Sequence, residues 1–310
     1  MGRRRSKGRK VSGIVLLDKP TGITSNRALQ IVKRLYNASK AGHTGSLDPL
    51  ATGLLPLCLG EATKVSGFLL DADKQYYATL KLGVKTSSAD AEGEVIATRP
   101  VENYPASEIE AVLQQFSGDI EQVPPMHSAL KVNGQPLYRL AHQGREIERK
   151  PRQVTIYNIE LLRHDGDEMD IRVNCSKGTY IRTLAEDIGE VLGCGAHLSA
   201  LRRTRSGPFD IADSVTLEQL EEIQEAEAGS FEALDRLLVP AEEALDDWPT
   251  IHLSENAAFY ICRGQAVMVP KAPTEGLVRL FSAEKGFLGI GEILDDGRIK
   301  PQRLFLSEQA

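Results

Sequence analysis

The spacing of apolar residues along the chain predicts several amphipathic helices. In each segment the apolar residues recur three or four positions apart, which places them on one face of a helix with 3.6 residues per turn. The segments lie near 25–35, 109–116, 181–191 and 216–223. Ser25 is the expected N-cap of the first helix, and Gly118 and Gly193 follow the second and third, where a glycine commonly ends a helix.

Strict alternation of apolar and polar residues predicts strands over 76–82 and 169–175, and an apolar run predicts another over 13–17. Tyr76 shares the inward face of its strand with alanine and leucine, so its ring belongs either to the core or to the rim of a site. The strand at 169–175 continues through a glycine turn at Gly178 into the helix over 181–191.

The pattern changes after Trp248 and Pro249. Residues 250–310 contain short apolar runs separated by glycine and proline, and 295–297 reads Asp-Asp-Gly, a typical hairpin turn. This segment is predicted to be a small all-β module.

Composition is that of an ordinary soluble globular protein, with 310 residues, of which 41% are hydrophobic and 26% charged. This length has room for about two domains. The four cysteines form no Cys-x-x-Cys pair, which argues against a disulfide framework or a four-cysteine zinc site and favours a reducing, cytoplasmic location. The longest uncharged stretch, 49–60, is far shorter than the ~20 apolar residues of a membrane span, so no membrane association is expected.

The charge is unevenly distributed along the chain. The net charge is −6, but residues 210–247 contain 13 acidic residues and a single arginine, so the rest of the chain is positive by six. Basic residues gather in the first ten positions, in 131–152 and in 202–205. These clusters could form a phosphate-binding face, although solvated surface is an equally good interpretation.

Familiar catalytic motifs are missing: the sequence contains no nucleotide-binding glycine loop, no His-Glu-x-x-His and no Gly-x-Ser-x-Gly. The densest feature is residues 42–53, GHTGSLDPLATG, in which three glycines and a proline predict a stiff loop around Asp48. An Asp-Pro pair is also a common turn, so composition alone does not make Asp48 catalytic.

Longer strings are more specific. AGHTGSLDPLATGLLPLCLGEATK, preceded by GIVLLDKPTGITS and followed by DKQYYATLKLG, SADAEGE, CSKGTYIRTLAEDIG and CGAHLSALRR, resembles the bacterial TruB family of tRNA pseudouridine-55 synthases. The resemblance extends from about Gly13 to the C-terminus. Within 250–310 it rests on EGLVRLF and GIGEI, which look like that family's PUA domain, an RNA-binding barrel.

The resemblance implies an α+β fold: a catalytic domain over 11–249 with a mixed, mainly antiparallel sheet flanked by helices, and a small PUA-like barrel over 250–310. A basic flexible tail would occupy 1–10. The basic insertion at about 124–152 resembles an RNA-gripping thumb loop, although a disordered surface loop is the alternative.

The activity implied is isomerisation of uridine 55 in the T-arm loop of tRNA to pseudouridine, without cofactor or metal. The enzyme would flip the uridine out, break its glycosidic bond and rejoin the base through C5. A carboxylate suits such covalent catalysis. Attack at C1′, removal of a proton from C2′ and attack at C6 of the base all remain open. We expect a cytoplasmic monomer whose partner is the T-arm stem-loop of tRNA, and assistance with tRNA folding is a second expected role.

The resemblance also assigns residues. The catalytic set is Asp48, Tyr76, Arg182 and Asp90, with Arg182 between two carboxylates so that Asp48 stays ionised. The substrate-binding set has five members, of which Tyr76 is shared with the catalytic set: His43, Tyr76, Tyr180, Leu201 and Lys64. Lys19 and Pro20 match a first motif that we interpret as structural support. The expected RNA contacts are basic: Lys131, Arg145, Arg149, Arg152, Arg202 and Arg203.

Simpler interpretations exist for several of these residues. Tyr76 could be plain core, Arg182 could pair with Glu186 one turn along its helix, and His43 could be an ordinary loop hydrogen-bonder. For the chain as a whole, the alternatives are a noncatalytic tRNA-binding or folding protein and an RNA-guided relative within a ribonucleoprotein. The Asp48, Tyr76 and Arg182 set argues against the first, and the thumb-like insertion against the second.

Overall fold

The computed structural model describes residues 8–305 except 129, 133, 142 and 227–228. Its largest element is a sheet of nine strands. Seven of them form the main path β1-β3-β12-β4-β11-β10-β7, and β2 and β13 pair with β3 and β12 at the side. All neighbouring strands run antiparallel except β12 and β3, which are parallel. The mixed, mainly antiparallel sheet expected from the sequence is therefore confirmed.

The strands of this sheet span a wide range of lengths, from two residues to fourteen. They are β1 (Gly13–Lys19), β2 (Ala41–His43), β3 (Thr52–Leu59), β4 (Lys74–Leu82), β7 (Gly118–Gln122), β10 (Arg152–Asp165), β11 (Glu168–Cys175), β12 (Ala196–Ser206) and β13 (Phe209–Asp210). Separate two-stranded ribbons are β5 (Val84–Thr86) with β6 (Val95–Thr98), and β8 (Lys131–Val132) with β9 (Gln135–Pro136).

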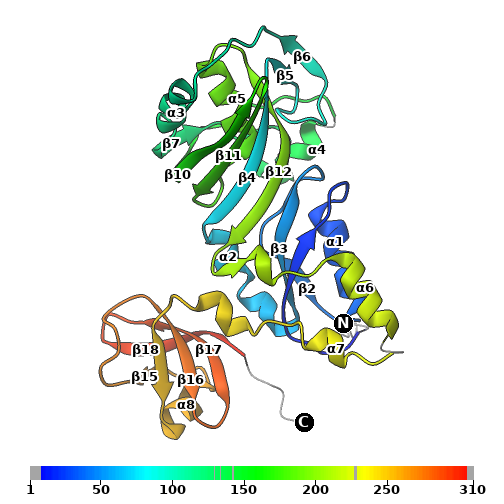
Figure 1. Cartoon of the computed structure of the whole chain (residues 1–310). Helices are drawn as coiled ribbons and strands as arrows, with labels where there is room; N and C mark the ends of the chain where they lie inside the picture. The colour runs from blue at the N-terminus through cyan, green and yellow to red at the C-terminus, as the bar shows by residue number, and fades with distance from the viewer. Residues whose placement is uncertain (1–7, 129, 133, 142, 227–228, 306–310) are drawn as a thin grey trace.

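Helices cover this sheet. The α-helices of the sheet region are α1 (Ser25–Leu35), α2 (Ser66–Asp71), α3 (Ala106–Gln114), α4 (Leu137–Ala141), α5 (Ile181–Val191), α6 (Leu217–Ala226) and α7 (Glu232–Asp235), and the 3-10 turns are η1 (Gly60–Lys64), η2 (Ile211–Asp213) and η3 (Ala241–Leu245). Figure 1 shows α1 and α6 beside β1 to β3, and α3 and α5 beside the long strands at the other end of the sheet.

The predicted helices and strands match the observed ones closely, with two corrections. The α1 N-cap is Thr24, whose hydroxyl accepts from the Arg27 amide, while Ser25 bonds instead to Leu47. Phe116 lies beyond the end of α3, because the chain turns there toward β7. The apolar stripes of α1 and α5 are buried as the spacing predicts.

The C-terminal part forms a separate five-stranded sheet in the order β14-β16-β17-β18-β15. These strands are β14 (Thr250–Leu253), β15 (Val267–Met268), β16 (Leu277–Ser282), β17 (Gly286–Ile293) and β18 (Arg298–Leu304). The expectation of an all-β module overlooked one helix, α8 (Glu255–Ile261), which begins at Ser254 with a side-chain cap to Ala257. Ser254 precedes a run without glycine or proline, the local signal for a short helix.

The C-terminal sheet packs against the region of the nine-stranded sheet near η1 and α2. Phe68 meets Trp248 edge to face with 4.9 Å between ring centroids. Ile290 of β17 is fully buried in a cluster that also contains Ile14 and Leu54. The two sheets therefore share apolar contact where Figure 1 shows the module beside the lower end of the molecule.

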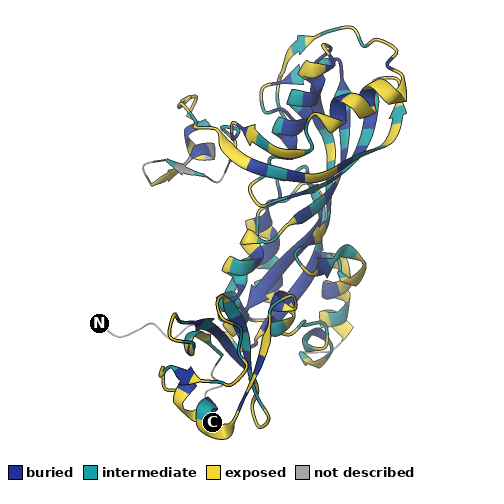
Figure 2. Cartoon of the chain, turned by 90° about the vertical axis from the view of Figure 1, so that its left-hand side faces the viewer, coloured by how far each residue is buried: buried dark blue, intermediate teal, exposed yellow. Residues whose placement is uncertain are grey.

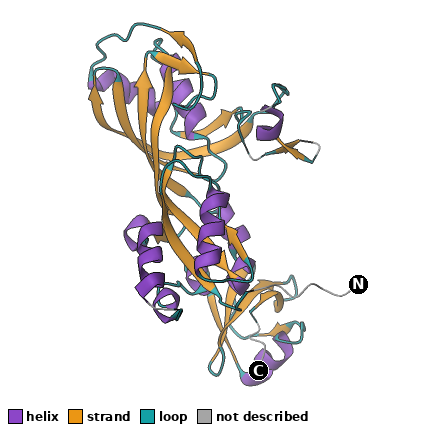
Figure 3. Ribbon diagram, turned by 90° about the vertical axis from the view of Figure 1, so that its right-hand side faces the viewer, coloured by secondary structure: helices purple, strands orange, loops and turns teal. Residues whose placement is uncertain are grey.

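Two expectations about mobile segments are modified. Arg9, placed in the flexible tail, is anchored: it forms an ion pair with Asp235, donates to the Tyr36 carbonyl at 2.9 Å and stacks on Phe231. In the insertion at 124–152, the β8–β9 ribbon and α4 project from the body of the molecule (Figures 2 and 3). The described part of the insertion is thus a folded arm. No helix among the described residues is long and apolar enough to cross a membrane.

Candidate active site

The loop that carries Asp48 joins β2 to β3 and is held along its length. The Thr44 hydroxyl donates to the Pro56 carbonyl at 3.2 Å, and the Ser25 hydroxyl both donates to the Leu47 carbonyl and accepts from its amide, at 2.9 and 2.7 Å. Thr44 and Leu47 are buried. Asp48, which follows Leu47, is therefore presented from a fixed backbone.

Asp48 and Asp90 share one guanidinium. Arg182 lies in the first turn of α5, and its Nε is 3.0 Å from Asp48 Oδ2 while its Nη1 is 3.4 Å from Asp90 Oδ2. The side chains of Arg182 and Asp90 are 6% and 4% exposed, whereas that of Asp48 is 42% exposed. The expected pairing of Arg182 with both carboxylates is present, and Asp48 is the member that solvent or a substrate can reach.

The remaining donors of Arg182 bind main-chain oxygens. Nη2 donates to the His127 carbonyl at 2.7 Å and Nη1 to the Ser88 carbonyl at 3.4 Å. Asp90 is fixed in turn, because its Oδ1 accepts from the Ser88 hydroxyl at 2.5 Å and from the Glu92 amide at 3.1 Å. The guanidinium is therefore locked in one orientation, and His127 ties it to the base of the insertion.

Burial and charge act in opposite directions on Asp48. Burial raises the pKa of Asp48 above its usual value, the Arg182 guanidinium lowers it, and the neighbouring Asp90 raises it again. The net direction is upward, so the expectation that Arg182 alone keeps Asp48 ionised covers only one of the opposing effects. A raised carboxylate pKa makes a stronger base and nucleophile, provided that the group is ionised at working pH.

Lys19 lies beneath this loop. It is fully buried, and its ammonium group donates to the carbonyls of Pro20 and Ile23, both at 2.8 Å. Burial lowers the pKa of Lys19 to about 8, and Asp48 opposes that fall. These main-chain contacts support the interpretation of Lys19 as structural support for the turn after β1.

Tyr76 lies on β4 between β11 and β12, opposite Val173 and Arg203. It is 9% exposed. Burial raises the pKa of its phenol, the Arg203 guanidinium opposes that rise, and the charge of Asp48 adds to it. Tyr76 is thus both a core residue and within electrostatic reach of Asp48, so the two interpretations of its inward face are compatible.

His43 ends β2 at the start of the same loop. Its Nδ1 is buried without a hydrogen-bond partner among the described residues. Burial and the nearby Arg203 both lower the pKa of His43, which favours the neutral ring. An orphaned buried nitrogen leaves a donor or acceptor open for a bound molecule.

Tyr180 and Leu201 lie on neighbouring elements. Tyr180 is the N-cap residue of α5, and the Gln122 side chain clamps its main chain, accepting from the Tyr180 amide at 3.0 Å and donating to its carbonyl at 3.3 Å. Leu201 of β12 is opposite Ala78 and packs against the main core. Lys64 is different: it contacts Glu61, the Leu304 carbonyl at 2.6 Å and the Phe305 ring. These contacts tie Lys64 to the C-terminal module rather than to the Asp48 network.

The basic residues expected at the RNA surface have different environments. Arg203 is 1% exposed, so its assignment as a surface phosphate contact is wrong; the alternation of β12 turns it into the core. Arg202 forms a forked pair with Asp18, at 3.0 and 2.6 Å. Arg145 and Arg152 are exposed, Arg149 donates to the Pro124 carbonyl at 3.2 Å, and the Lys131 side chain lies outside the described residues.

Two residues that help to hold the site together could not be identified from the sequence. His127 acts through its main-chain carbonyl, which any residue would supply, and Gln122 acts on the main chain of a residue 58 positions away. No local pattern could reveal either contact.

The chemistry of the assembled site is that of a partly exposed carboxylate aimed by a buried cation, beside a tyrosine. Within the described residues no three side chains of metal-ligand type come together.

Comparison with known families gives matches along most of the chain. Residues 33–181 match the model described as TruB family pseudouridylate synthase (N terminal domain). Residues 182–246 match the tRNA pseudouridylate synthase B C-terminal domain, and 249–305 match Pseudouridine synthase II TruB, C-terminal.

Individual proteins are similar over nearly the whole length. A tRNA pseudouridine synthase B of Ectopseudomonas mendocina is 59% identical over 96% of both chains, and one of Nitrosococcus oceani is 56% identical over 98% of both. Among solved structures, a chain of a Cbf5-Nop10-Gar1 complex has a TM-score of 0.75 at 30% identity, covering 95% of this chain and 85% of that one. A chain of an H/ACA RNP bound to a substrate RNA has a TM-score of 0.73 at 28% identity, with the same coverage.

Proposed function

Because this chain belongs to the TruB family of tRNA pseudouridine synthases, we propose that it converts uridine 55 in the T-arm loop of tRNA to pseudouridine. The enzyme is an isomerase that forms pseudouridine in tRNA, and the proposal concerns which uridine it uses and how. The single observation that carries the proposal is the position of Asp48, partly exposed on a fixed loop and 3.0 Å from the buried Arg182.

Asp48 is the carboxylate that starts the reaction. The N1 glycosidic bond breaks, the uracil turns while it is held, and a bond forms from C1′ to C5. Asp48 serves as nucleophile at C1′, as base at C2′ or as nucleophile at C6 of the base, and all three roles require an ionised carboxylate within reach of the nucleotide. Arg182 stabilises that ionised form and Asp90 fixes Arg182 from the other side.

Tyr76 and His43 complete the pocket in this proposal. The uridine leaves its stack, stacks on the Tyr76 ring, and loses its C5 proton after rejoining. The buried Nδ1 of His43 offers a polar contact near the space that the base vacates. In this proposal one nucleotide meets both Tyr76 and Asp48, whose charge adds to the rise in the pKa of the Tyr76 phenol.

The RNA would lie along the basic arm. Arg145 and Arg152 are exposed on the 124–152 insertion, whose base reaches Arg182 through the His127 carbonyl. The insertion is therefore attached to the site at its base, where the His127 carbonyl accepts from Arg182. The acidic residues of 210–247 would face away from the RNA, and residues 250–310 would form the appended RNA-binding domain.

Two alternatives make different predictions. A noncatalytic RNA-binding or folding protein has no need of a carboxylate aimed by a buried guanidinium, and the presence of this network favours catalysis. A guide-RNA-dependent enzyme is suggested by the H/ACA structures, but identity to them is 28 to 30%, against 56 to 59% to tRNA pseudouridine synthases B. The higher identity favours free tRNA as the substrate.

Release of tritium from [5-³H]uridine tests the function directly, because only rejoining through C5 expels that hydrogen. Transcribed tRNA and a T-arm stem-loop should both release one equivalent, and the label should be retained in a tRNA with cytidine at position 55. Asp48→Asn keeps the shape and removes the charge, so turnover should fall by at least about 10³-fold with RNA affinity nearly unchanged. Activity within tenfold of wild type would show that Asp48 is not the catalytic carboxylate.

Charge reversal tests the orientation of the RNA. Arg145→Glu with Arg152→Glu should raise the dissociation constant for tRNA and flatten its dependence on salt, because phosphate contacts release counterions. The matched reversal on the acidic helix, Glu221→Lys with Glu222→Lys, should change neither quantity by more than about twofold. Equal effects of the two reversals would mean that the RNA does not follow the arm.

A further inference from the structure

One buried arginine outside the Asp48 network has no carboxylate to balance it. Arg203 of β12 is 1% exposed, and within the described part of the chain no acidic side chain pairs with it. Its Nε donates to the Leu54 carbonyl at 2.7 Å and its Nη2 to the Gly45 carbonyl at 3.3 Å. Burying a charge without a counterion is costly, so an arginine that only filled space would be a poor choice.

The two carbonyls lie on either side of Asp48 in the chain. Gly45 precedes Asp48 by three residues and Leu54 follows it by six, so one planar guanidinium fixes the separation of the two ends of the loop. The backbones also meet: Gly53 has φ +101°, and a Cβ there would lie 2.3 Å from the Arg203 carbonyl oxygen. A larger residue at position 53 would push the loop away from β12.

The same guanidinium acts on Tyr76. Arg203 is the residue opposite Tyr76 in the pairing of β12 with β4. The Arg203 guanidinium opposes the rise in the pKa of the Tyr76 phenol, whereas Cys175 of β11 and Asp48 add to that rise. Arg203 thus contacts the strand that carries one reactive group and both ends of the loop that carries the other.

We infer that Arg203 is a positioning residue, which holds the Asp48 loop and the Tyr76 hydroxyl in a single geometry. The inference rests on the roles proposed above for Asp48 and Tyr76. It assigns the charge of Arg203 to the reaction instead of to RNA binding. A guanidinium is needed because an ammonium group cannot present planar donors to the Leu54 and Gly45 carbonyls together from the position opposite Tyr76.

The test compares Arg203→Met and Arg203→Lys with the wild-type full-length chain under single-turnover conditions, with enzyme in saturating excess over a tritiated T-arm stem-loop. Arg203→Met should slow tritium release about 100-fold and Arg203→Lys about tenfold, because Lys keeps the charge but loses the fork. The dissociation constant for the stem-loop should change by less than about threefold, which separates positioning from RNA binding.

The Tyr76 phenol distinguishes a positioning role of Arg203 from a purely structural one. Tyrosine labelled with ¹³C at Cζ reports each phenol by NMR, and the Tyr76 signal is the one that disappears in Tyr76→Phe. Its pKa should rise further in Arg203→Met. In the Tyr76→Phe background, Arg203→Met should cost only about tenfold in rate, since part of its effect acts through the hydroxyl.

Lys74→Met is the matched control. Lys74 is another buried cation, and among the described residues its ammonium group donates to main-chain carbonyls near the end of α2, including Leu70 at 2.8 Å and Leu69 at 3.2 Å. Its loss should lower the melting temperature and leave the Tyr76 pKa unchanged. The single-turnover rate should stay within about threefold of wild type.

Several results would overturn the inference. They are equal rate losses for Arg203→Met with and without the Tyr76 hydroxyl, an unchanged Tyr76 pKa, or a loss for Lys74→Met as large as that for Arg203→Met. If Arg203→Met does not fold, Arg203→Lys provides the same comparison with Tyr76→Phe. Absence of tritium release by the wild-type chain would instead refute the proposed function, so the two failures are distinguishable.

Discussion

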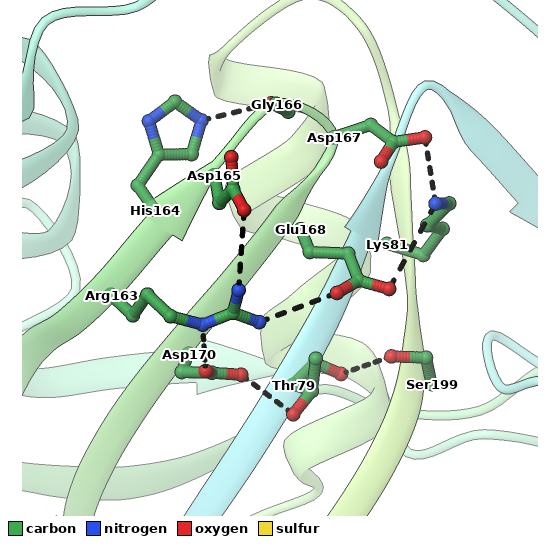
Figure 4. A network of polar contacts seen from close by, with 10 residues as sticks. All are labelled: Thr79, Lys81, Arg163, His164, Asp165, Gly166, Asp167, Glu168, Asp170 and Ser199. Carbon is green, nitrogen blue, oxygen red and sulfur yellow. Dashed lines mark hydrogen bonds and ion pairs between the residues drawn. The ribbon is translucent and has the colours of Figure 1, made fainter.

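Two ion-pair networks in the molecule behave differently. One is the site network, in which the buried guanidinium of Arg182 joins the partly exposed Asp48 and the buried Asp90. The other surrounds the turn between β10 and β11, where Arg163 contacts Asp165, Glu168 and Asp170, and Lys81 contacts Asp167 and Glu168 (Figure 4). Their distances are similar, with Arg163 Nε 2.7 Å from Asp170 Oδ2 and Arg182 Nε 3.0 Å from Asp48 Oδ2.

Burial explains why similar contacts have different consequences. The Arg163 side chain is 47% exposed and that of Arg182 is 6% exposed. At the exposed turn, the hydrogen bond from Lys81 is enough to lower the pKa of Asp167. In the site, burial outweighs Arg182 and the pKa of Asp48 rises. Solvent stabilises the charges at the turn, whereas the buried charges of Arg182 and Asp90 depend on their partners, so removing a partner in the site should matter most.

Removal of the buried cation should have the largest effect. Arg182→Met leaves Asp48 and Asp90 without their shared partner, so turnover should fall about 10³-fold. Catalysis needs ionised Asp48, and Arg182 lowers the Asp48 pKa, so its loss should raise that pKa and move the acid limb of the pH-rate profile to higher pH. Single-turnover rates measured across pH check both effects. An acid limb that stays in place would separate Arg182 from the ionisation of Asp48.

A smaller change to the same network should show non-additive losses. Arg182→Lys keeps the charge but cannot reach both carboxylates and two main-chain carbonyls, so turnover should fall about 100-fold. Asp90→Ala removes the second carboxylate. Because both act on Asp48 through one guanidinium, the double variant should lose less than the product of the single losses. A double-mutant cycle of single-turnover rates measures this coupling, and fully multiplicative losses would contradict it.

The sequence predicted most of the site network but not every residue around it. The site residues Asp48, Tyr76 and Arg182 were identified from long motifs, and the geometry brings Asp48, Asp90 and Arg182 into contact. Arg203 was misassigned because a run of arginines resembles a basic surface, and only the alternation of β12 shows which neighbour faces the core. The α8 helix was missed because it is short (Glu255–Ile261) and begins directly after the alternating residues of β14 (Thr250–Leu253), so no separate helical stripe stands out. Contacts through main-chain groups, such as the His127 carbonyl, depend on the assembled backbone and leave no pattern in the side chains.

Asp187 of α5 is half-buried, between the two networks in exposure. Its substitution should have an effect of intermediate size, on the free energy of unfolding. Burial raises its pKa to about 6, while Lys85, whose charge opposes that rise, forms its ion pairs with Glu186 and Glu190. A carboxyl whose folded pKa exceeds its unfolded value favours folding most when protonated, so stability falls as pH rises from about 4 to 6. Asp187→Asn should therefore raise the free energy of unfolding at pH 7.5 by about 1 kcal/mol, after allowance for residual solvent screening.

Urea unfolding of Asp187→Asn and wild type at pH 4 and pH 7.5 checks this prediction. The difference between the proteins should be small at pH 4, where the carboxyl is protonated in the folded state, and larger at pH 7.5. The neighbouring variant Glu186→Gln controls for the loss of a negative charge near Lys85. If Asp187→Asn were destabilising at pH 7.5, the buried carboxylate would have a favourable partner and the direction of the argument would be reversed.

The exposed network should respond least. Arg163→Met removes the contacts to three carboxylates, but each partner retains contact with water, and Asp170 also keeps its bond from the Thr79 hydroxyl at 2.7 Å. The melting temperature should change by less than about 2 °C, and that small change should disappear in 1 M salt, which screens surface charges. The rate of tritium release should be unchanged. If Arg163→Met slowed the reaction tenfold at full RNA saturation, the turn would belong to the catalytic machinery, and burial would no longer explain the difference between the two networks.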